Sequence, residues 1–192
     1  MRLVPRHWLV LGVLISLLAA IAAAQFPYIN WYPSVPPVES RPMVIRQDAG
    51  GDGHFLAPRN GRRQHRGLDL AAAVNTPVRA IRSGRVVKVE RHRGMGRYIE
   101  LDHGRRLHSV YAHLNSVDVR KGQHVTQGQI IGLAGKTGNA RHAWITPHLH
   151  LEVVRNGTPV NPATLGVSPM EPATRMAQTA APGALMDESG GE

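Results

Sequence analysis

Short apolar runs separated by glycines fill the middle of the chain. The runs are PVRAI, GRVVKVER, RYIELDHG, RLHSVYAHL, QIIGLAG and LHLEVVR. Evenly spaced runs of this length, with turn residues between them, are typical of β-strands, and no long stretch among them has a helical period. The pattern therefore predicts an all-β domain over residues 46–163, mostly antiparallel and folded as a sandwich or barrel.

A long apolar run stands near the N-terminus. It extends from Trp8 to Ala24, follows a basic stretch that contains Arg2 and Arg6, and closes on small residues. A basic start, an apolar core and a small-residue end are typical of an export signal. The run also reaches the lower limit of a membrane-spanning helix, about 17 residues. Residues 1–24 are therefore predicted to be a signal peptide or a membrane anchor, and both place the remaining chain in the periplasm or cell envelope.

The segments on either side of the predicted domain have no strand or helix period. Residues 25–45 contain five prolines and scattered aromatic residues, which predicts an extended Pro-rich linker able to lie along the domain surface. Residues 164–192 are rich in Ala, Pro, Gly, Thr and Met and close with DESGGE. This composition predicts a disordered tail.

Composition limits the chemistry and indicates the partner. The chain of 192 residues has no cysteine, which excludes disulfides and a thiolate zinc site. Its net charge is +10, and most of this excess lies in the predicted domain. Nucleic acid is the common partner of such a basic chain, but an exported protein without interleaved aromatic platforms meets anionic cell-wall polymers and lipid first. We expect no nucleic acid, and some of the arginines simply solvate strand faces.

Histidines and one aspartate form the candidate chemical site. His65 and Asp69 lie in QHRGLDL, and His148 and His150 lie in PHLHLEV. Imidazole and carboxylate suit zinc, and three such ligands leave it an open fourth position. On a strand, His148 and His150 share one face while Leu149 faces the core, so one histidine can bind metal while the other transfers protons.

Five short segments carry a resemblance to a known family. They are HRGLD from His65 to Asp69, then YAHL, then two turns that contain Gly-Gln, and then HLHLEV. In this order, over about residues 55 to 163, they resemble the lysostaphin-type (LytM-like) zinc metallopeptidases of bacterial cell walls. The resemblance implies a β-sheet groove that holds a metal. It also implies an endopeptidase that cuts peptide bonds in peptidoglycan stem peptides or cross-bridges.

The same resemblance implies a role for each site residue. It assigns zinc (Zn²⁺) to His65, Asp69 and His150, and it makes His113 of YAHL and His148 the two remaining active-site histidines. In this hypothesis zinc activates water, and the two histidines accept the water proton, return it to the leaving amine, or donate a hydrogen bond to the tetrahedral oxyanion. Which histidine is the general base stays open. The chain has no HExxH helix, so a glutamate base is not expected.

Two positions near the site leave alternatives open. After Thr137-Gly138 the segment NARHAWITP is longer than the turn usual in the family, which predicts an altered groove wall and so an altered substrate choice. Trp144 in this segment is either a substrate platform or a hydrophobic anchor. Tyr111, two residues before His113 on the predicted strand, either lines the groove or belongs to the core.

Two other functions compete with the zinc peptidase. One is a non-catalytic wall-binding module that activates a separate amidase, as in family members that have lost zinc ligands. The other follows from VRKGQHVTQGQIIGLAGKTG, which also resembles the half-motifs of biotinyl and lipoyl carrier domains. The retained histidines disfavour the first, and Lys136, which lacks the flanking residues of a carrier lysine, disfavours the second.

Overall fold

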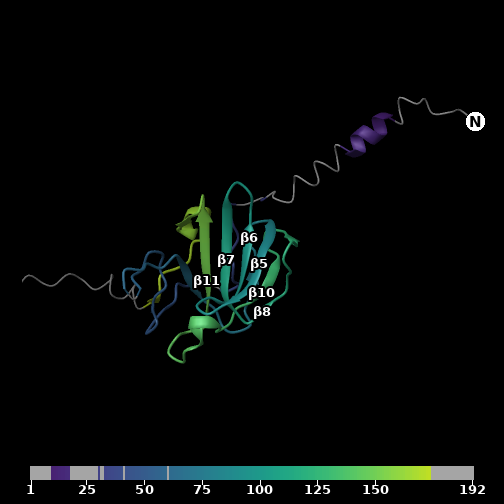
Figure 1. Ribbon diagram of the computed structural model, residues 1–192. Coiled ribbons are helices and arrows are strands. Elements are labelled where there is room, and N and C mark those ends of the chain that lie inside the picture. The colour runs from purple at the N-terminus through teal and green to yellow at the C-terminus, as the bar shows by residue number, and fades with distance from the viewer. Residues whose placement is uncertain (1–9, 18–29, 31–32, 41, 60, 174–192) are drawn as a thin grey trace, which may run out of the picture.

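Within the residues that the structure describes, the body of the protein consists of twelve strands and two 3-10 helices, and Figure 1 shows how they are arranged. The computed structural model describes residues 10–17, 30, 33–40, 42–59 and 61–173. The strands are β1 (Gln47–Asp48), β2 (Gly51–Asp52), β3 (Gly67–Ala71), β4 (Pro77–Arg79), β5 (Gly84–His92), β6 (Gly96–Asp102), β7 (Leu107–Leu114), β8 (Ser116–Val117), β9 (His124–Val125), β10 (Ile130–Leu133), β11 (His148–Arg155) and β12 (Thr158–Val160). The 3-10 helices are η1 (Gly138–Arg141) and η2 (Pro162–Leu165).

The strands form one large sheet and two small ones. The large sheet has the order β12-β11-β7-β6-β5-β9, and β3 pairs with β11 on the edge that it shares with β12. A second sheet has the order β4-β10-β8, and β1 pairs with β2. Every pairing between these strands is antiparallel. The predicted all-β, mostly antiparallel fold is therefore confirmed, and each of the six apolar runs contains a strand.

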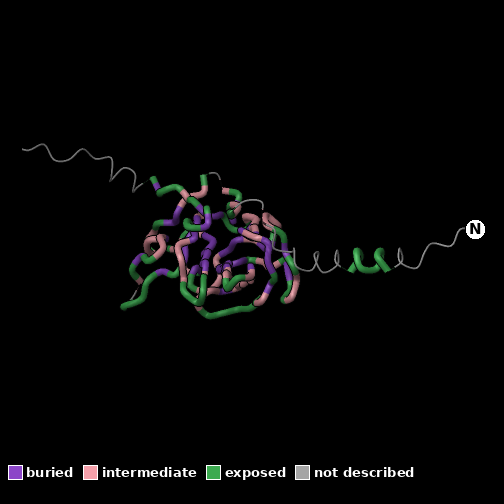
Figure 2. Tube along the Cα trace, turned by 90° about the horizontal axis from the view of Figure 1, so that it is seen from above, coloured by how far each residue is buried: buried purple, intermediate pink, exposed green. Residues whose placement is uncertain are grey.

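The core lies between side chains of the two larger sheets. Ile99 and Leu101 alternate with the more exposed Tyr98 and Glu100 along β6, the period expected when one face of a strand is buried. The small sheet contributes Ile131, which is also fully buried. Figure 2 shows the buried residues gathered at the centre of the body. Removal of this apolar surface from water is the main stabilising contribution.

A chain of polar groups crosses the core beside these apolar residues. His103 Nδ1 donates to the carbonyl of Ser83 (2.8 Å), and its Nε2 lies 2.7 Å from Ser109 Oγ. Ser109 Oγ in turn lies 3.0 Å from the Tyr111 hydroxyl, which accepts a hydrogen bond from the backbone N–H of Ile81. Tyr111 is fully buried, so it belongs to the core and does not line the groove.

The burial of His103 makes stability depend on pH. Burial lowers the pKa of His103 to about 4, whereas an exposed histidine titrates near pH 6.5. Between these values the unfolded chain binds the proton and the folded chain does not. The free energy of unfolding should therefore fall as the pH drops from about 6.5 to about 4, with His103 contributing up to about 3 kcal/mol of the loss. Urea unfolding of the metal-free protein at several pH values measures this, and His103→Gln should have a shallower pH dependence. Equal slopes for the two proteins would contradict the prediction.

The segments that flank the predicted domain are packed onto it where the structure describes them. Val38 and Ile45 of the predicted linker belong to the core, as do Leu165 and Val167 of the predicted tail. The folded body therefore extends beyond residues 46–163 at both ends. Isolated apolar side chains make these contacts, and they have no period by which the sequence could reveal them.

The predicted signal or anchor lies mostly outside the described residues. Within it, residues 10–17 form a helix whose residues are all exposed. Across the part of the chain that the structure describes, no helix combines the length and apolar character needed to cross a bilayer. Residues 174–192 of the predicted tail also lie outside the described residues.

Candidate metal centre

All five predicted site residues line one pocket of about 750 Å³. His65 precedes β3, Asp69 lies on β3, and His113 lies on β7. His148 and His150 both face the pocket from β11, while Leu149 between them is fully buried in the core. The expected division of β11 into a pocket face and a core face is confirmed. The structure thus gathers side chains from three segments into one place.

Antiparallel pairing brings the distant segments together. Asp69 and His150 are direct partners in the β3–β11 register, and Ala112, next to His113, is the partner of His150 on β7. Directly opposed residues have Cβ atoms about 5 Å apart. The side chains of Asp69 and His150 are therefore close enough to bind the same small cation.

Three donor atoms of this group lie at the spacing that a metal ion requires. His65 Nε2 lies 3.0 Å from His150 Nδ1 and 3.1 Å from Asp69 Oδ1. The distance from His150 Nδ1 to Asp69 Oδ1 is 2.8 Å. A tetrahedral zinc ion with its usual bond lengths spaces its ligand atoms about 3.3 Å apart. The donors need to move by only a few tenths of an ångström to hold zinc, and two imidazoles with a carboxylate are a donor set that zinc accepts.

Backbone carbonyls orient three of the imidazole rings. His65 Nδ1 donates a hydrogen bond to the carbonyl of His54 (2.7 Å), which leaves the lone pair of its Nε2 available to bind a metal. His113 and His148 likewise donate from Nδ1 to backbone carbonyls, at 2.9 Å and 2.7 Å. In the neutral form Nε2 of both rings is then an acceptor. The centroids of the His113 and His148 rings lie 4.8 Å apart, so the two act on the same space.

A β-bulge turns His113 toward the pocket. The register between β6 and β7 shifts between the pairs Ile99 with Tyr111 and Arg97 with Leu114, which leaves one extra residue on β7. His113 has φ of 63°, a left-handed conformation that non-glycine residues seldom adopt. Its N–H donates to the carbonyl of Met95 (2.8 Å), which stabilises the bulge. Because of the extra residue, Tyr111 faces the core while His113 faces the pocket.

Burial and the hydrogen bonds of the site set its charges. Burial alone would raise the pKa of Asp69, but the close contacts with the His150 and His65 rings hold it well below its ordinary value. Burial would likewise lower the pKa of His150, yet the neighbouring carboxylates of Asp69 and Glu152 raise it to about 9. The pKa of His113 falls to about 3 and that of His148 is also lowered, mainly through burial. The metal-free site therefore holds a carboxylate against an imidazolium, beside two neutral imidazoles.

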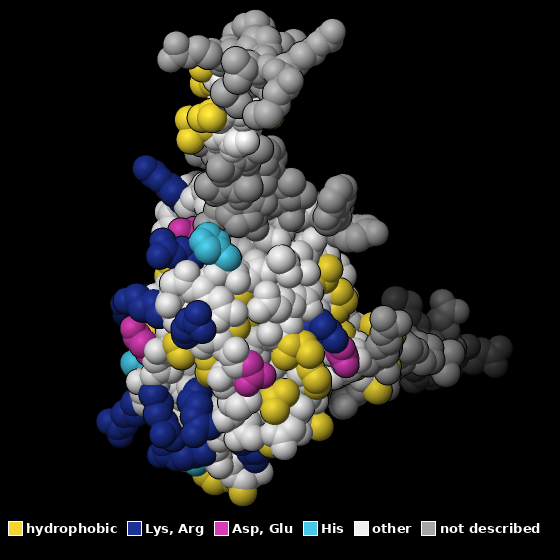
Figure 3. Space-filling model, turned by 90° about the vertical axis from the view of Figure 1, so that its right-hand side faces the viewer, with side chains coloured by type: hydrophobic (Ala, Val, Ile, Leu, Met, Phe, Trp, Pro, Cys, Tyr) yellow, Lys and Arg dark blue, Asp and Glu magenta, His cyan; other side chains and the backbone are white. Residues whose placement is uncertain are grey.

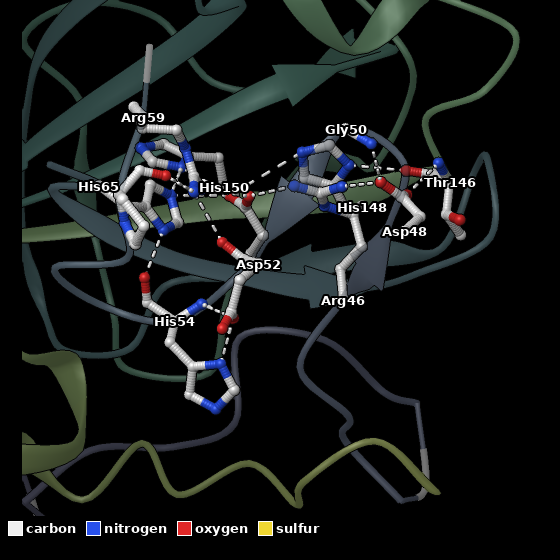
Figure 4. Close-up of polar contacts among 12 residues, drawn as sticks. Arg46, Asp48, Gly50, Asp52, His54, Arg59, His65, Thr146, His148 and His150 are labelled. Atoms are coloured by element: carbon white, nitrogen blue, oxygen red, sulfur yellow. Dashed lines mark hydrogen bonds and ion pairs between the residues drawn. The ribbon is translucent and has the colours of Figure 1, made fainter. Parts of the chain in front are cut away.

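The buried side chain of Arg46 bridges the carboxylates of Asp69 and Asp48, and Figure 4 shows it beside Asp48. Arg46 donates to Asp69 Oδ2 (2.8 Å), the oxygen that does not face His150, and it also pairs with Asp48. Asp48 accepts a hydrogen bond from the backbone N–H of Thr146 (2.6 Å), and the Thr146 carbonyl is the one that orients His148. One network thus connects the two sides of the pocket. Nothing in the sequence marks Arg46, because no spacing relates it to the HRGLD motif.

The long segment after Thr137 forms one wall of the pocket. Asn139, Ala140 and Ile145 line it, so the segment is part of the groove wall, and its effect on substrate choice stays a prediction. Trp144 is 60% exposed, and its ring stacks on His142 with centroids 4.7 Å apart. Its exposure excludes a buried anchor, so the platform role remains as the prediction.

The sequence of this chain is similar to those of known peptidases. The sequence profile of Peptidase family M23 matches residues 63–162. Peptidoglycan DD-endopeptidase ShyA of Vibrio cholerae is 39% identical over 116 residues, which are 59% of this chain and 26% of that protein. DD-carboxypeptidase/endopeptidase Mpg of Neisseria meningitidis is 37% identical over 127 residues, 66% of this chain and 28% of Mpg. The chain therefore corresponds to little more than a quarter of the length of these relatives.

Solved structures share the fold. The catalytic domain of lysostaphin from Staphylococcus simulans is 34% identical, with a TM-score of 0.53 over 62% of this chain and 91% of that domain. A zinc-containing peptidase from Vibrio cholerae is 32% identical, with a TM-score of 0.56 over 76% of this chain and 41% of that one.

Proposed function

The chain belongs to peptidase family M23, and on this premise we propose that it is an exported zinc-dependent endopeptidase. Its proposed substrates are the peptide bonds of peptidoglycan stem peptides or cross-bridges, in keeping with relatives that are named peptidoglycan DD-endopeptidases. One observation carries the proposal. Donor atoms of His65, Asp69 and His150 lie within 3.1 Å of one another, and two neutral histidines face the same pocket.

The roles of the five residues follow from their hydrogen bonds. His65, Asp69 and His150 are the proposed metal ligands, because each directs one potential ligand atom to the same point. A zinc ion held there would act as a Lewis acid, making water a better nucleophile and a peptide carbonyl a better electrophile. His113 and His148 present Nε2 as acceptors.

His113 and His148 are the proposed proton carriers. Since Nδ1 of each is committed to a carbonyl, Nε2 of either ring can take the proton of the attacking water. The resulting imidazolium remains hydrogen-bonded through Nδ1 to the same carbonyl, which stabilises its charge. It can then return the proton to the amine that leaves when the peptide C–N bond breaks.

The location and further partners are also proposals. Residues 1–24 would export the chain or anchor it in the inner membrane, and the packed body that follows would be the zinc peptidase domain. Figure 3 shows Lys and Arg side chains gathered over one part of the surface, and the net charge is +10. We expect this charge to draw the protein to anionic polymers of the cell wall, an attraction that salt weakens.

Digestion of purified sacculi tests the proposed function. The full chain with zinc should release soluble peptides whose new termini identify the bond that was cut, and mass spectrometry of the released muropeptides detects them. His150→Ala is the control, because it removes one proposed ligand. Equal release by both proteins would contradict the metal mechanism. Binding to sacculi without release would favour the non-catalytic activator.

A further inference from the structure

His150 differs from the other site histidines in what holds its second ring nitrogen. Its Nδ1 lies 2.8 Å from Asp69 Oδ1, and its Nε2 lies 3.1 Å from Glu152 Oε1. The other three site histidines each donate to a backbone carbonyl. His150 is thus the one member of the group that is oriented by a carboxylate.

Glu152 is a buried carboxylate whose nearest charged partner is His150. It lies two residues after His150 on β11, on the same strand face, and is only 5% exposed. Arg66 approaches it to 3.8 Å, but the Arg66 side chain is 60% exposed, and such a pair contributes little. A carboxylate removed from water costs free energy unless a donor compensates it. The hydrogen bond with His150 is the interaction that can do so.

The hydrogen bond also decides which ring nitrogen faces the metal position. Nδ1 of His150 lies beside the two other donor atoms, Nε2 of His65 and Oδ1 of Asp69. A neutral imidazole that offers Nδ1 as a ligand must carry its proton on Nε2. Glu152 accepts the hydrogen bond from this Nε2–H group. A carboxylate in this position fixes the orientation of the ring and makes Nδ1 a stronger ligand.

We infer that Glu152 is a positioning residue of the metal centre, which holds His150 with Nδ1 toward the ion and its proton on Nε2. The inference rests on the proposed function in that zinc is the expected ion. The effect of Glu152 passes entirely through His150.

Zinc affinity is the measurement that tests this role, because it does not depend on hydrolysis. Competition with a chromophoric chelator gives the affinity of the full chain. Glu152→Ala should weaken it by about 10–100-fold. Glu152→Gln keeps an oxygen that accepts the hydrogen bond but removes its charge, so its loss should be smaller than that of the alanine variant.

Glu100→Ala is the matched control. Glu100 lies on β6 and, like Glu152, lines a second groove that is distinct from the metal pocket. Its partners are Lys88 (2.7 Å) and His108 (3.0 Å). Removing it deletes a partly buried carboxylate without touching a site histidine. Its zinc affinity should equal that of the parent.

The ring nitrogens of His150 provide a second readout. In the zinc-loaded parent, the ¹⁵N spectrum should show a protonated Nε2 that exchanges slowly with solvent. This signal should shift in Glu152→Gln and broaden through faster exchange in Glu152→Ala. If the alanine variant does not fold, the nearly isosteric glutamine variant decides. Unchanged zinc affinity together with an unchanged His150 spectrum in Glu152→Gln would overturn the inference.

The inference and the proposed function fail separately. A parent chain that binds zinc but releases no peptide from sacculi contradicts the proposed hydrolase and leaves the role of Glu152 in place. Conversely, a protein that cleaves sacculi while both Glu152 variants bind zinc like the parent retains its proposed function. That result would reduce Glu152 to a packing residue.

Discussion

Replacement of His113 or His148 by alanine is expected to lower the rate of peptide hydrolysis about 10²–10⁴-fold while one zinc ion stays bound to each chain. Neither residue is among the three with converging donor atoms, so the proposed metal site survives either substitution. What is lost is a neutral Nε2 able to accept the water proton. Turnover of a purified muropeptide, measured beside zinc content, separates the two effects.

His124→Ala serves as the control for these variants. His124 is exposed on β9 and is not among the residues that line the pocket, so its substitution should leave both turnover and zinc content unchanged. Full activity in either pocket variant would show that the residue carries no proton. Loss of zinc from either would move that histidine into the metal-ligand set.

The second large effect concerns Arg46. In the metal-free protein, Arg46→Ala should lower the free energy of unfolding by about 3–5 kcal/mol, the usual cost of removing one partner of a buried ion pair. Arg46 is 4% exposed and Asp69 3% exposed, so the carboxylate that remains cannot recover its hydration and keeps only its contacts with His65, His150 and Arg59. Added zinc should reduce this loss, because the ion compensates the charge of Asp69. Urea unfolding with and without zinc measures both values.

Arg79→Ala is the matched control for Arg46. Arg79 also pairs with a carboxylate, Glu39, but the two side chains are 32% and 51% exposed. An exposed pair of this kind contributes at most about 1 kcal/mol, and zinc should not alter its effect. If the two arginine variants lost equal stability, the buried network around Asp69 would not be what stabilises this region.

Much of the fold follows from local pattern. The run RYIELDHG alternates apolar and polar residues and forms β6, and LHLEVVR forms β11. Alternation is a property of the strand itself, so it is visible before the partners of the strand are known. For the same reason the sequence indicated that His148 and His150 face one side, as they do. Membership of the family, indicated by the order of the motifs, is confirmed by the profile match over residues 63–162.

Other features depend on neighbours that the sequence does not place. Simple alternation would place Tyr111 and His113 on the same face of β7, but the bulge places them on opposite faces. The bulge depends on a backbone hydrogen bond from His113 to Met95. Val38 and Leu165 join the core from segments without any period. Single residues of this kind become buried only when folding brings a distant apolar surface into contact with them.

The amino-acid order by itself determined the strands, their antiparallel class and the set of five residues with the chemistry for a metal site. Only the tertiary structure decided which atoms of those residues converge and which groups hold them there. Arg46 and Glu152 are the clearest cases, since each acts on a ligand through a side-chain contact. The physical reason is that strand period and ligand type are local properties. Hydrogen-bond partners and buried charge pairs are set by folding, which brings residues distant in the chain to within 3 Å or so of one another.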